Sequence, residues 1–214
     1  MAEITRKELL LALIGAGDAP RLGGIDLSAL DLSGLYLAHA RMREADLRET
    51  NLHRTSLRGA DLQEADLRGA NLHVADLSEA DLRGASLRVA RLDGAILRQA
   101  RLDTASLDGA TLHETDARGA VLREADLRGA ELQGADLTEA NLTEADLRGV
   151  LMNAANLSGA SLDRANLQGA SLQGAVVAGA SFRGCNLRGA DLQNVDLSAA
   201  DLEGADLQGT NVAD

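Results

Sequence analysis

The stretch ADLQEADLRGANLHVADLSEADLRGASLRVARL, residues 60–92, decides the fold because it repeats a unit of five residues. A central leucine recurs at every fifth position from Leu22 to Leu207 with few substitutions, and the residue two before it is nearly always alanine. A period of five fits neither the turn of an α-helix nor the alternation of a flat strand. Such short self-similarity is typical of a solenoid, in which each unit buries its apolar face against the next.

Each pentad has two inward positions and three outward ones. If a pentad makes one short strand and one turn, the leucine and the alanine two before it point inward. Glycine often stands two residues after the leucine, as in 67–70, 127–130 and 187–190. A type II turn requires a positive φ at this position, which glycine supplies. Aspartate or asparagine before the leucine can accept hydrogen bonds from nearby backbone amides.

The repeated motif A-[DN]-L-x-x resembles the pentapeptide-repeat family over nearly the whole chain past residue 20. Three of its copies are residues 65–67, 70–72 and 145–147. The resemblance implies an all-β fold, a right-handed quadrilateral β-helix with four pentads per coil. On that geometry residues twenty apart stack at about 4.8 Å, and about nine coils form a rod on the order of 45 Å long.

Residues 1–20 break the repeat and predict a short N-terminal α-helical cap with its linker, ahead of a β-helix over residues 21–214. Thr5 and Glu8 have the spacing of a capping box, with Ile4 and Leu9 as a hydrophobic staple. Leu9, Leu10 and Leu13 would form one apolar face, and Gly15 or Gly17 would end the helix. Its expected role is to cover the open end of the first coil, where Ile25, Leu30 and Leu35 replace the usual alanine.

A signal peptide is the alternative reading of this segment, because Arg6 and Lys7 precede the apolar run 9–16. Glu3 and Glu8 stand where such a peptide carries no acids, and the run is short. The capping signals therefore favour the helix.

The predicted core is a set of leucine columns. Leu47, Leu67, Leu127 and Leu147 share one column, and the outward Asp46, Asp66 and Asp126 share one face. Ala117 removes three carbons from another column, which predicts an inward collapse or a small void. Phe182 follows Val177 by one pentad, so a large residue offsets a smaller one.

The composition sets limits on partners and compartment. The net charge of −12 and the isoelectric point near 4.7 disfavour direct binding of nucleic acid or an anionic membrane. No apolar stretch of 18 residues predicts a transmembrane helix. The single Cys185 takes an inward position and excludes an intramolecular disulfide, which suits a reducing compartment and predicts a cytoplasmic protein.

One outward column carries the only candidate metal ligands. His53, His73, Asp93 and His113 are spaced by twenty residues and could hold zinc if their side chains converge. The same column also holds Gln133, Asn153, Gln173 and Gln193. The alternative is therefore an exposed position that tolerates many residues and binds no metal.

The sequence predicts no enzyme and no cofactor. Its serines have no paired base, its carboxylates belong to the repeat, and a convex rod offers no cleft. The expected function is a protein-binding or scaffold module. The resemblance also allows a DNA-mimicking modulator of DNA gyrase or topoisomerase IV, but the charge is spread over all four faces, at roughly half the density of duplex DNA. On one face Asp46, Asp66, Asp126 and Asp146 are each followed by an arginine two residues later.

The C-terminal end predicts a homodimer. After Leu207 the sequence predicts no helix that would cover the last coil. Its apolar groups and strand edges would then be exposed and prone to aggregation unless something covers them. A second copy related by a two-fold axis would do so. The residues expected at this interface are Leu192, Leu197, Leu202, Leu207 and Val212.

Overall fold

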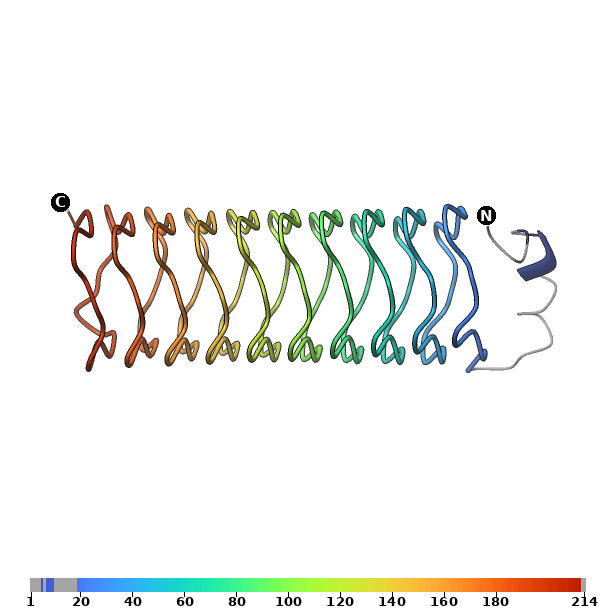
Figure 1. The fold of residues 1–214 in the computed structure, drawn as a ribbon, viewed down its shortest axis with the longest axis horizontal. Helices are drawn as coiled ribbons and strands as arrows, with labels where there is room; N and C mark the ends of the chain where they lie inside the picture. Colours follow the sequence, from blue (N-terminus) through green and yellow to red (C-terminus); the bar gives the residue numbers. More distant parts are fainter. Residues whose placement is uncertain (1–4, 6, 10–18, 213–214) are drawn as a thin grey trace.

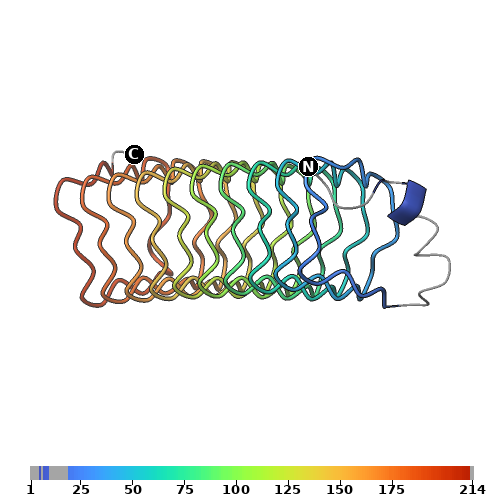
Figure 2. The same ribbon diagram turned by 45° about the vertical axis from the view of Figure 1, so that its right-hand side comes forward.

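The chain forms a rod of stacked coils (Figure 1), described by a computed structural model for residues 5, 7–9 and 19–212. Parallel bridges join residues twenty apart, from Arg21↔Arg41 to Asp191↔Asn211, so four pentads complete one coil. Full coils run from 21–40 to 181–200, and 201–212 begins another. The turned view in Figure 2 shows the coils following one another in chain order. The bridge Asp46↔Asp66 confirms the predicted stacking.

Each side of a coil is held by backbone hydrogen bonds to its neighbours. A side consists of one bridged residue followed by a two-residue turn, and residues 19–212 contain no longer strand. The amide of Leu67 donates to the carbonyl of Ser86 at 2.7 Å, and the amide of Gly69 donates to Arg88 at 3.0 Å. The expected short strand is thus reduced to a single bridged residue, and the coil above holds both the bridge and the turn.

The turns have the expected left-handed residue at their third position. Ala70 donates to Leu67 at 3.0 Å across the turn, and Gly69 between them has a φ of 68°. Non-glycine residues adopt the same conformation, for example Glu64 with a φ of 59°. For an L-residue this conformation is unfavourable. The stack enforces it, because the amide at this position donates to the next coil.

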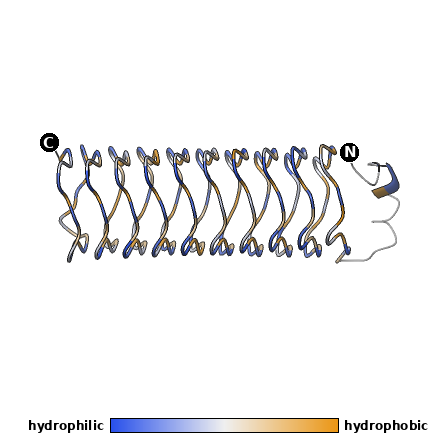
Figure 3. Cartoon of the chain, viewed as in Figure 1, coloured by the Kyte–Doolittle hydropathy of each residue, from blue (hydrophilic) through white to orange (hydrophobic). Residues whose placement is uncertain are grey.

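The interior is filled as the repeat predicts. Leu47, Leu67, Leu127 and Leu147 are fully buried, and hydrophilic and hydrophobic residues alternate around every coil (Figure 3). Phe182 is also buried in this cluster, as is Val177, one pentad before it. The bore therefore needs almost no aromatic residues.

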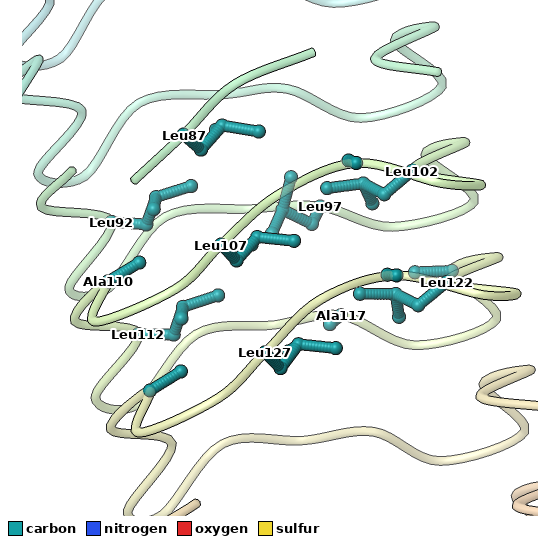
Figure 4. Close-up of a cluster of buried hydrophobic side chains, with 14 of the residues drawn as sticks. Leu87, Leu92, Leu97, Leu102, Leu107, Ala110, Leu112, Ala117, Leu122 and Leu127 are labelled. Carbon is teal, nitrogen blue, oxygen red and sulfur yellow. The ribbon is translucent and has the colours of Figure 1, made fainter. Parts of the chain in front are cut away.

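Ala117 stands among leucines in the buried interior of the rod (Figure 4). The amide of Ala117 donates to Asp136 at 2.8 Å, so the backbone keeps its regular path and has not collapsed inward. Leucines two coils away, such as Leu67, have no accessible surface, but the inward side chains around Ala117 retain some. Their exposures are Leu97 1%, Leu112 2%, Ala117 3%, Leu122 2%, Leu132 2% and Leu137 1%. Of the two predicted outcomes, this pattern supports the void.

Four buried inward positions carry a polar atom in place of a bare alanine methyl. The hydroxyls of Thr50, Thr55 and Thr115 each donate to the carbonyl of the leucine 23 residues earlier, at 2.8–3.0 Å. The thiol of Cys185 makes the same contact with Leu162 at 2.7 Å. Burial raises the pKa of Cys185 to about 12, so the thiol stays protonated. The predicted core role of Cys185 is confirmed.

The N-terminal segment begins with the predicted capping box. The amide of Thr5 donates to the Glu8 carboxylate at 2.8 Å, and the amide of Glu8 donates to the Thr5 hydroxyl at 3.3 Å. Residues 7–9 are helical, and Leu9 is fully buried in the same cluster as the coils. Ile25 packs partly buried against this cluster. The predicted roles of Ile4, Leu10, Leu13, Gly15 and Gly17 lie outside the described residues.

Candidate interaction surface

Ion pairs run along the face that carries Asp46 and Asp66. The guanidinium of Arg68 donates two hydrogen bonds to Asp66, at 2.8 and 2.5 Å, and Arg48 contacts Asp46 in the same way. Arg48 also approaches Asp66 of the next coil at 3.7 Å. The same pairs form at Asp126–Arg128 and Asp146–Arg148. The prediction that arginines neutralise this acidic ladder is confirmed.

The arginines keep these carboxylates ionised. Hydrogen bonds from Arg48 and Arg68 lower the pKa of Asp46 and Asp66, and burial opposes the effect. The side chains remain partly exposed, so the pairs contribute little to stability. Their main consequence is electrostatic, because the carboxylates of Asp46, Asp66, Asp126 and Asp146 each have an arginine beside them.

The histidine column forms, but its side chains do not converge. The rings of His53 and His73 stack with centroids 5.3 Å apart, and each directs Nδ1 to a backbone carbonyl of the next coil. Asp93 instead accepts from the His113 amide at 3.2 Å, and the His113 ring contacts Glu131 at 3.0 Å. Among the described residues no three such side chains are placed to hold a metal ion. The zinc hypothesis is therefore corrected to a column of stacked and separately paired side chains.

A surface without charge pairs occupies two adjacent sides of the last coils. Outward positions between residues 151 and 199 on these sides are small, polar or apolar, and only Asp191 and Asp196 are charged. We call this region the uncharged surface. Its residues are Leu151, Asn153, Ala154, Asn156, Ser158, Gly159, Ser171, Gln173, Gly174, Val176, Ala178, Gly179, Asp191, Gln193, Asn194, Asp196, Ser198 and Ala199.

The same two sides are highly charged in the coils before it. Between residues 91 and 139 half of the eighteen outward positions hold Asp, Glu or Arg. These are Arg91, Asp93, Arg98, Glu114, Asp116, Arg118, Glu131, Asp136 and Glu139. The change from nine charged positions to two marks the uncharged surface as a distinct part of the rod.

Two large apolar side chains are exposed on the uncharged surface. Leu151 is 38% exposed and Val176 is 51% exposed, and both stand where the repeat usually has aspartate or asparagine. Nearby, the side-chain amide of Gln173 donates to the side-chain carbonyl oxygen of Gln193 at 3.0 Å. The surface thus combines apolar side chains with uncharged hydrogen-bonding groups.

Among the described residues, the hydrogen-bonded ladder between coils is interrupted at one place, on the uncharged surface. By the pattern of every earlier coil, the Val177 amide would donate to Asp196 and the Asp196 amide to Ala175, but neither bond forms. The bridge between Val176 and Asp196 is also missing. The amide of Gly179 donates to Ala199 at 3.0 Å, one residue beyond the usual acceptor. The segment 195–199 has therefore shifted away from the coil before it.

Ala199 explains this shift. It is the one third-position turn residue between 24 and 209 whose φ is not positive. No described coil lies beyond it to accept its amide hydrogen bond. The other turn residues in this situation, Asn194, Gly204 and Gly209, are types that tolerate a left-handed conformation without support. Alanine does not, so the turn relaxes and draws Asp196 out of the ladder.

The shift opens a hollow of about 230 Å³ beside the exposed Val176. Buried backbone groups without a partner are costly, by about 1–3 kcal/mol each. Val177 is 1% exposed and is one of the residues that line the hollow, so its unpaired amide is not in bulk water. The hollow is lined by Gly174, Val176, Val177, Ala178, Asp196 and Ala199, among others.

The C-terminal end becomes progressively more exposed. Leu192 is 2% exposed, Leu197 and Leu202 are partly buried, Leu207 is 36% exposed and Val212 is 56% exposed. Of the residues predicted for a dimer interface, Leu207 and Val212 are exposed, Leu197 and Leu202 are partly covered, and Leu192 is buried. The described residues include no helix long and apolar enough to cross a membrane.

The sequence reasoning missed the uncharged surface and the hollow. The total charge of each face is similar, and these totals conceal a change along the axis. Counting charged positions coil by coil would have revealed the surface. The hollow had a weaker signal, namely alanine at residue 199 where Gly204 and Gly209 hold the following turns.

These features define a class of protein, a β-solenoid of stacked pentads whose distinctive parts are its outward surfaces. The chain belongs to the pentapeptide-repeat family. It matches the family described as pentapeptide repeats in eight copies, over residues 25–63, 56–92, 65–109, 90–123, 105–143, 140–177 and 178–212. The right-handed quadrilateral β-helix is the fold of this family, and the solved structures similar to this chain support it.

Two solved structures are similar over most of the chain. HetL, a pentapeptide repeat protein involved in heterocyst differentiation regulation from the cyanobacterium Nostoc sp. strain PCC 7120, is 36% identical with a TM-score of 0.58. The match covers 99% of this chain and 98% of HetL. QnrB1, a plasmid-mediated fluoroquinolone resistance protein, is 23% identical over 87% of this chain and 93% of its own, with a TM-score of 0.59. No curated protein matches the chain.

Proposed function

We propose that this protein is a non-enzymatic scaffold that binds another protein through the uncharged surface. The observation that carries the proposal is the axial change from nine charged outward positions to two. Proteins of this family are generally structural or binding modules, which agrees with the proposal.

The chemistry of the uncharged surface suits a protein interface. Charged residues are depleted in the buried centre of interfaces, because charges lose hydration when a partner covers them. Small side chains also lose little rotamer entropy on binding. The exposed Leu151 and Val176 would supply apolar contacts, and Gln173 and Gln193 would supply hydrogen bonds.

A charge placed on this surface tests the proposal. In Ser158→Arg the new residue occupies the column in which Arg98 and Arg118 already stand, so the fold accepts it. The matched control is Gln168→Arg, in the arginine column of another face, beside Arg148 and Arg188. Immobilised wild type and both variants would be used to capture proteins from an extract of the source cells, with cross-links mapped by mass spectrometry.

The expected result is a partner that cross-links to the uncharged surface and is retained at least tenfold less by Ser158→Arg than by wild type or Gln168→Arg. Equal retention by all three proteins would contradict the proposal. Circular dichroism would show that both variants keep the fold.

Modulation of DNA gyrase or topoisomerase IV is the alternative function. Its support is the likeness to QnrB1, which shows the fold. The acids on the Asp46–Asp146 face are paired with arginines, and this pairing favours a scaffold over a DNA mimic. A gyrase supercoiling assay with titrated protein, with and without a quinolone, tests the alternative, and no change at micromolar protein would remove it.

We also propose a homodimer joined at the C-terminal end. The exposures of Leu207 and Val212 support this interface. Acidic groups at its rim, such as Asp206, would make the dimer weaker at low ionic strength. Sedimentation of wild type and Leu207→Glu at several salt concentrations tests it, and a wild type that stays monomeric at tens of micromolar would overturn it.

The cytoplasm is the compartment that we propose. The buried and unpaired Cys185 supports a reducing environment. Fractionation of cells that express a tagged full-length chain, with detection in the cytoplasmic fraction, is the check.

A further inference from the structure

We propose that the hollow between Val176 and Asp196 binds an extended peptide segment of a partner protein, which adds to the coil as a strand and carries a small apolar residue next to a basic one. This inference rests on the proposed binding function and names a site and a partner chemistry within it.

Unpaired backbone groups give the hollow its specificity for a strand. In every earlier coil, the amide equivalent to that of Val177 and the carbonyl equivalent to that of Ala175 are both bonded to the bridged residue of the next coil. Asp196 would be that bridged residue here. Here both lack that partner, because Asp196 has moved away. An extended peptide presents an amide and a carbonyl at the required spacing, and this is the basis of peptide recognition by strand addition.

The lining of the hollow defines the side chains of the peptide. Val176, Val177 and Ala178 form an apolar wall, and a volume of about 230 Å³ accepts a small side chain with its backbone. The Asp196 carboxylate accepts from the Ser198 amide at 2.9 Å and makes no ion pair in the described structure. Hydrogen bonds from Ser198 also lower the pKa of Asp196, so the carboxylate is negative at neutral pH. A lysine or arginine on the peptide would pair with it.

Charge favours a foreign peptide over a second copy of this chain. The chain has a net charge of −12, and Asp196, Asp201 and Asp206 lie in its last two described coils. Two copies would bring like charges together at the hollow, whereas a neutral or basic peptide would not. The uncharged surface around the hollow would accommodate the rest of the partner.

A display selection with random twelve-residue peptides tests the site directly. Full-length wild type would serve as the target, and Ala199→Gly would be used to remove peptides that bind elsewhere. Glycine at residue 199 can adopt the left-handed turn of Gly204 and Gly209, so we expect the ladder to re-form and the hollow to close. Protection of the Val177 amide from hydrogen exchange would verify the closure.

Enriched peptides would be synthesised with a fluorophore and titrated by anisotropy. We expect alternating small apolar and Lys or Arg residues, an affinity at least tenfold weaker for Ala199→Gly, and a smaller loss with less salt dependence for Asp196→Asn. Ala29→Gly is the matched control, since Ala29 occupies a supported turn at the other end of the rod. It should leave binding unchanged.

Val176→Asp provides a second route, because aspartate is the usual residue at that position and the fold tolerates it. It should weaken binding even if Ala199→Gly fails to close the hollow. The proposal is overturned if no peptide is enriched, or if the enriched peptides bind all of these variants equally. If Ser158→Arg weakens peptide binding and Ala199→Gly does not, the uncharged surface still binds a partner, but the hollow is not the binding site. A dimer that Ala199→Gly abolishes and Leu207→Glu does not would show that the occupant is a second copy, which also rejects the proposal.

Discussion

Ala154 and Ala199 occupy equivalent positions of two different turns, but Ala154 is left-handed, with a φ of 57°, and Ala199 is not. The amide of Ala154 donates to the carbonyl of Gln173 in the next coil, at 2.9 Å. Ala199 has no such neighbour among the described residues. The difference shows that the covering coil, and not the turn residue, holds a non-glycine turn in this conformation.

The comparison extends from two turns to two regions of the rod. In the coils up to residue 180 the repeat needs neither glycine nor a fixed outward residue, because both neighbours constrain each side. In the last coils the intrinsic preference of each residue decides its conformation. The predictions below test this division, beginning with the largest effect.

The first prediction contrasts a covered leucine with an uncovered one. Leu127→Ala should lower the free energy of unfolding by about 2–5 kcal/mol, because it leaves a cavity between two complete coils. Leu207 is already 36% exposed, so Leu207→Ala should cost no more than about 1 kcal/mol. Urea denaturation followed by circular dichroism measures both, and equal losses would show that the end of the rod is covered in solution.

The second prediction concerns the void within the covered region. Ala117→Leu should be neutral or should raise the free energy of unfolding by up to about 2 kcal/mol, because the void that we infer at Ala117 would accept the added carbons. Ala125→Leu, at a fully packed inward position, is the control and should destabilise. If Ala117→Leu is as damaging as its control, the space does not exist.

The third prediction removes the difference between the two alanines. Ala199→Gly should stabilise the last full coil by about 0.5–1 kcal/mol, because glycine avoids the unfavourable left-handed conformation of alanine. Ala154→Gly should change stability by less, between neutral and a gain of about 1 kcal/mol, since glycine relieves the left-handed strain of Ala154 but adds entropy to the unfolded chain. Hydrogen exchange at Val177 and Asn156 reports on each coil separately, and no gain at Val177 would contradict this account of the shift.

The fourth prediction is the smallest and concerns pH. Arginine lowers the folded-state pKa of Asp46 and Asp66, so these carboxylates stabilise the fold above about pH 4 and lose that contribution as the pH falls further. Replacing Arg48 and Arg68 by glutamine should lower the urea midpoint at pH 7, and the difference from wild type should shrink towards pH 2. Arg123→Gln, at an arginine with no ion pair in the described structure, is the control. A difference that does not depend on pH would exclude the ion pairs as its cause.

The parts of the fold set by the period were predictable from the sequence. The burial of Leu67 and Cys185 follows from their positions in the repeat, and the Thr5–Glu8 capping box follows from the spacing of the two residues. Both signals can be seen directly in the sequence. The void at Ala117 could be predicted only as one of two outcomes, because the choice depends on whether neighbouring coils can move. The relaxed turn at Ala199 was not predicted, since Ala29 and Ala154 carry the same residue without relaxing. Such features depend on what covers a residue.

The constant span of the hydrogen-bonded ladder also has a consequence for folding. Each bridge joins residues twenty apart, so every coil closes a loop of the same length and loses about the same chain entropy on closure. The first coil has no template, whereas each later coil is laid on one that is already formed. Folding is therefore expected to nucleate once and then grow coil by coil along the axis. Growth should slow where a coil is imperfectly templated. If growth runs from the N-terminal coils, Asp196 is the first residue that does not form its bridge to the coil before it.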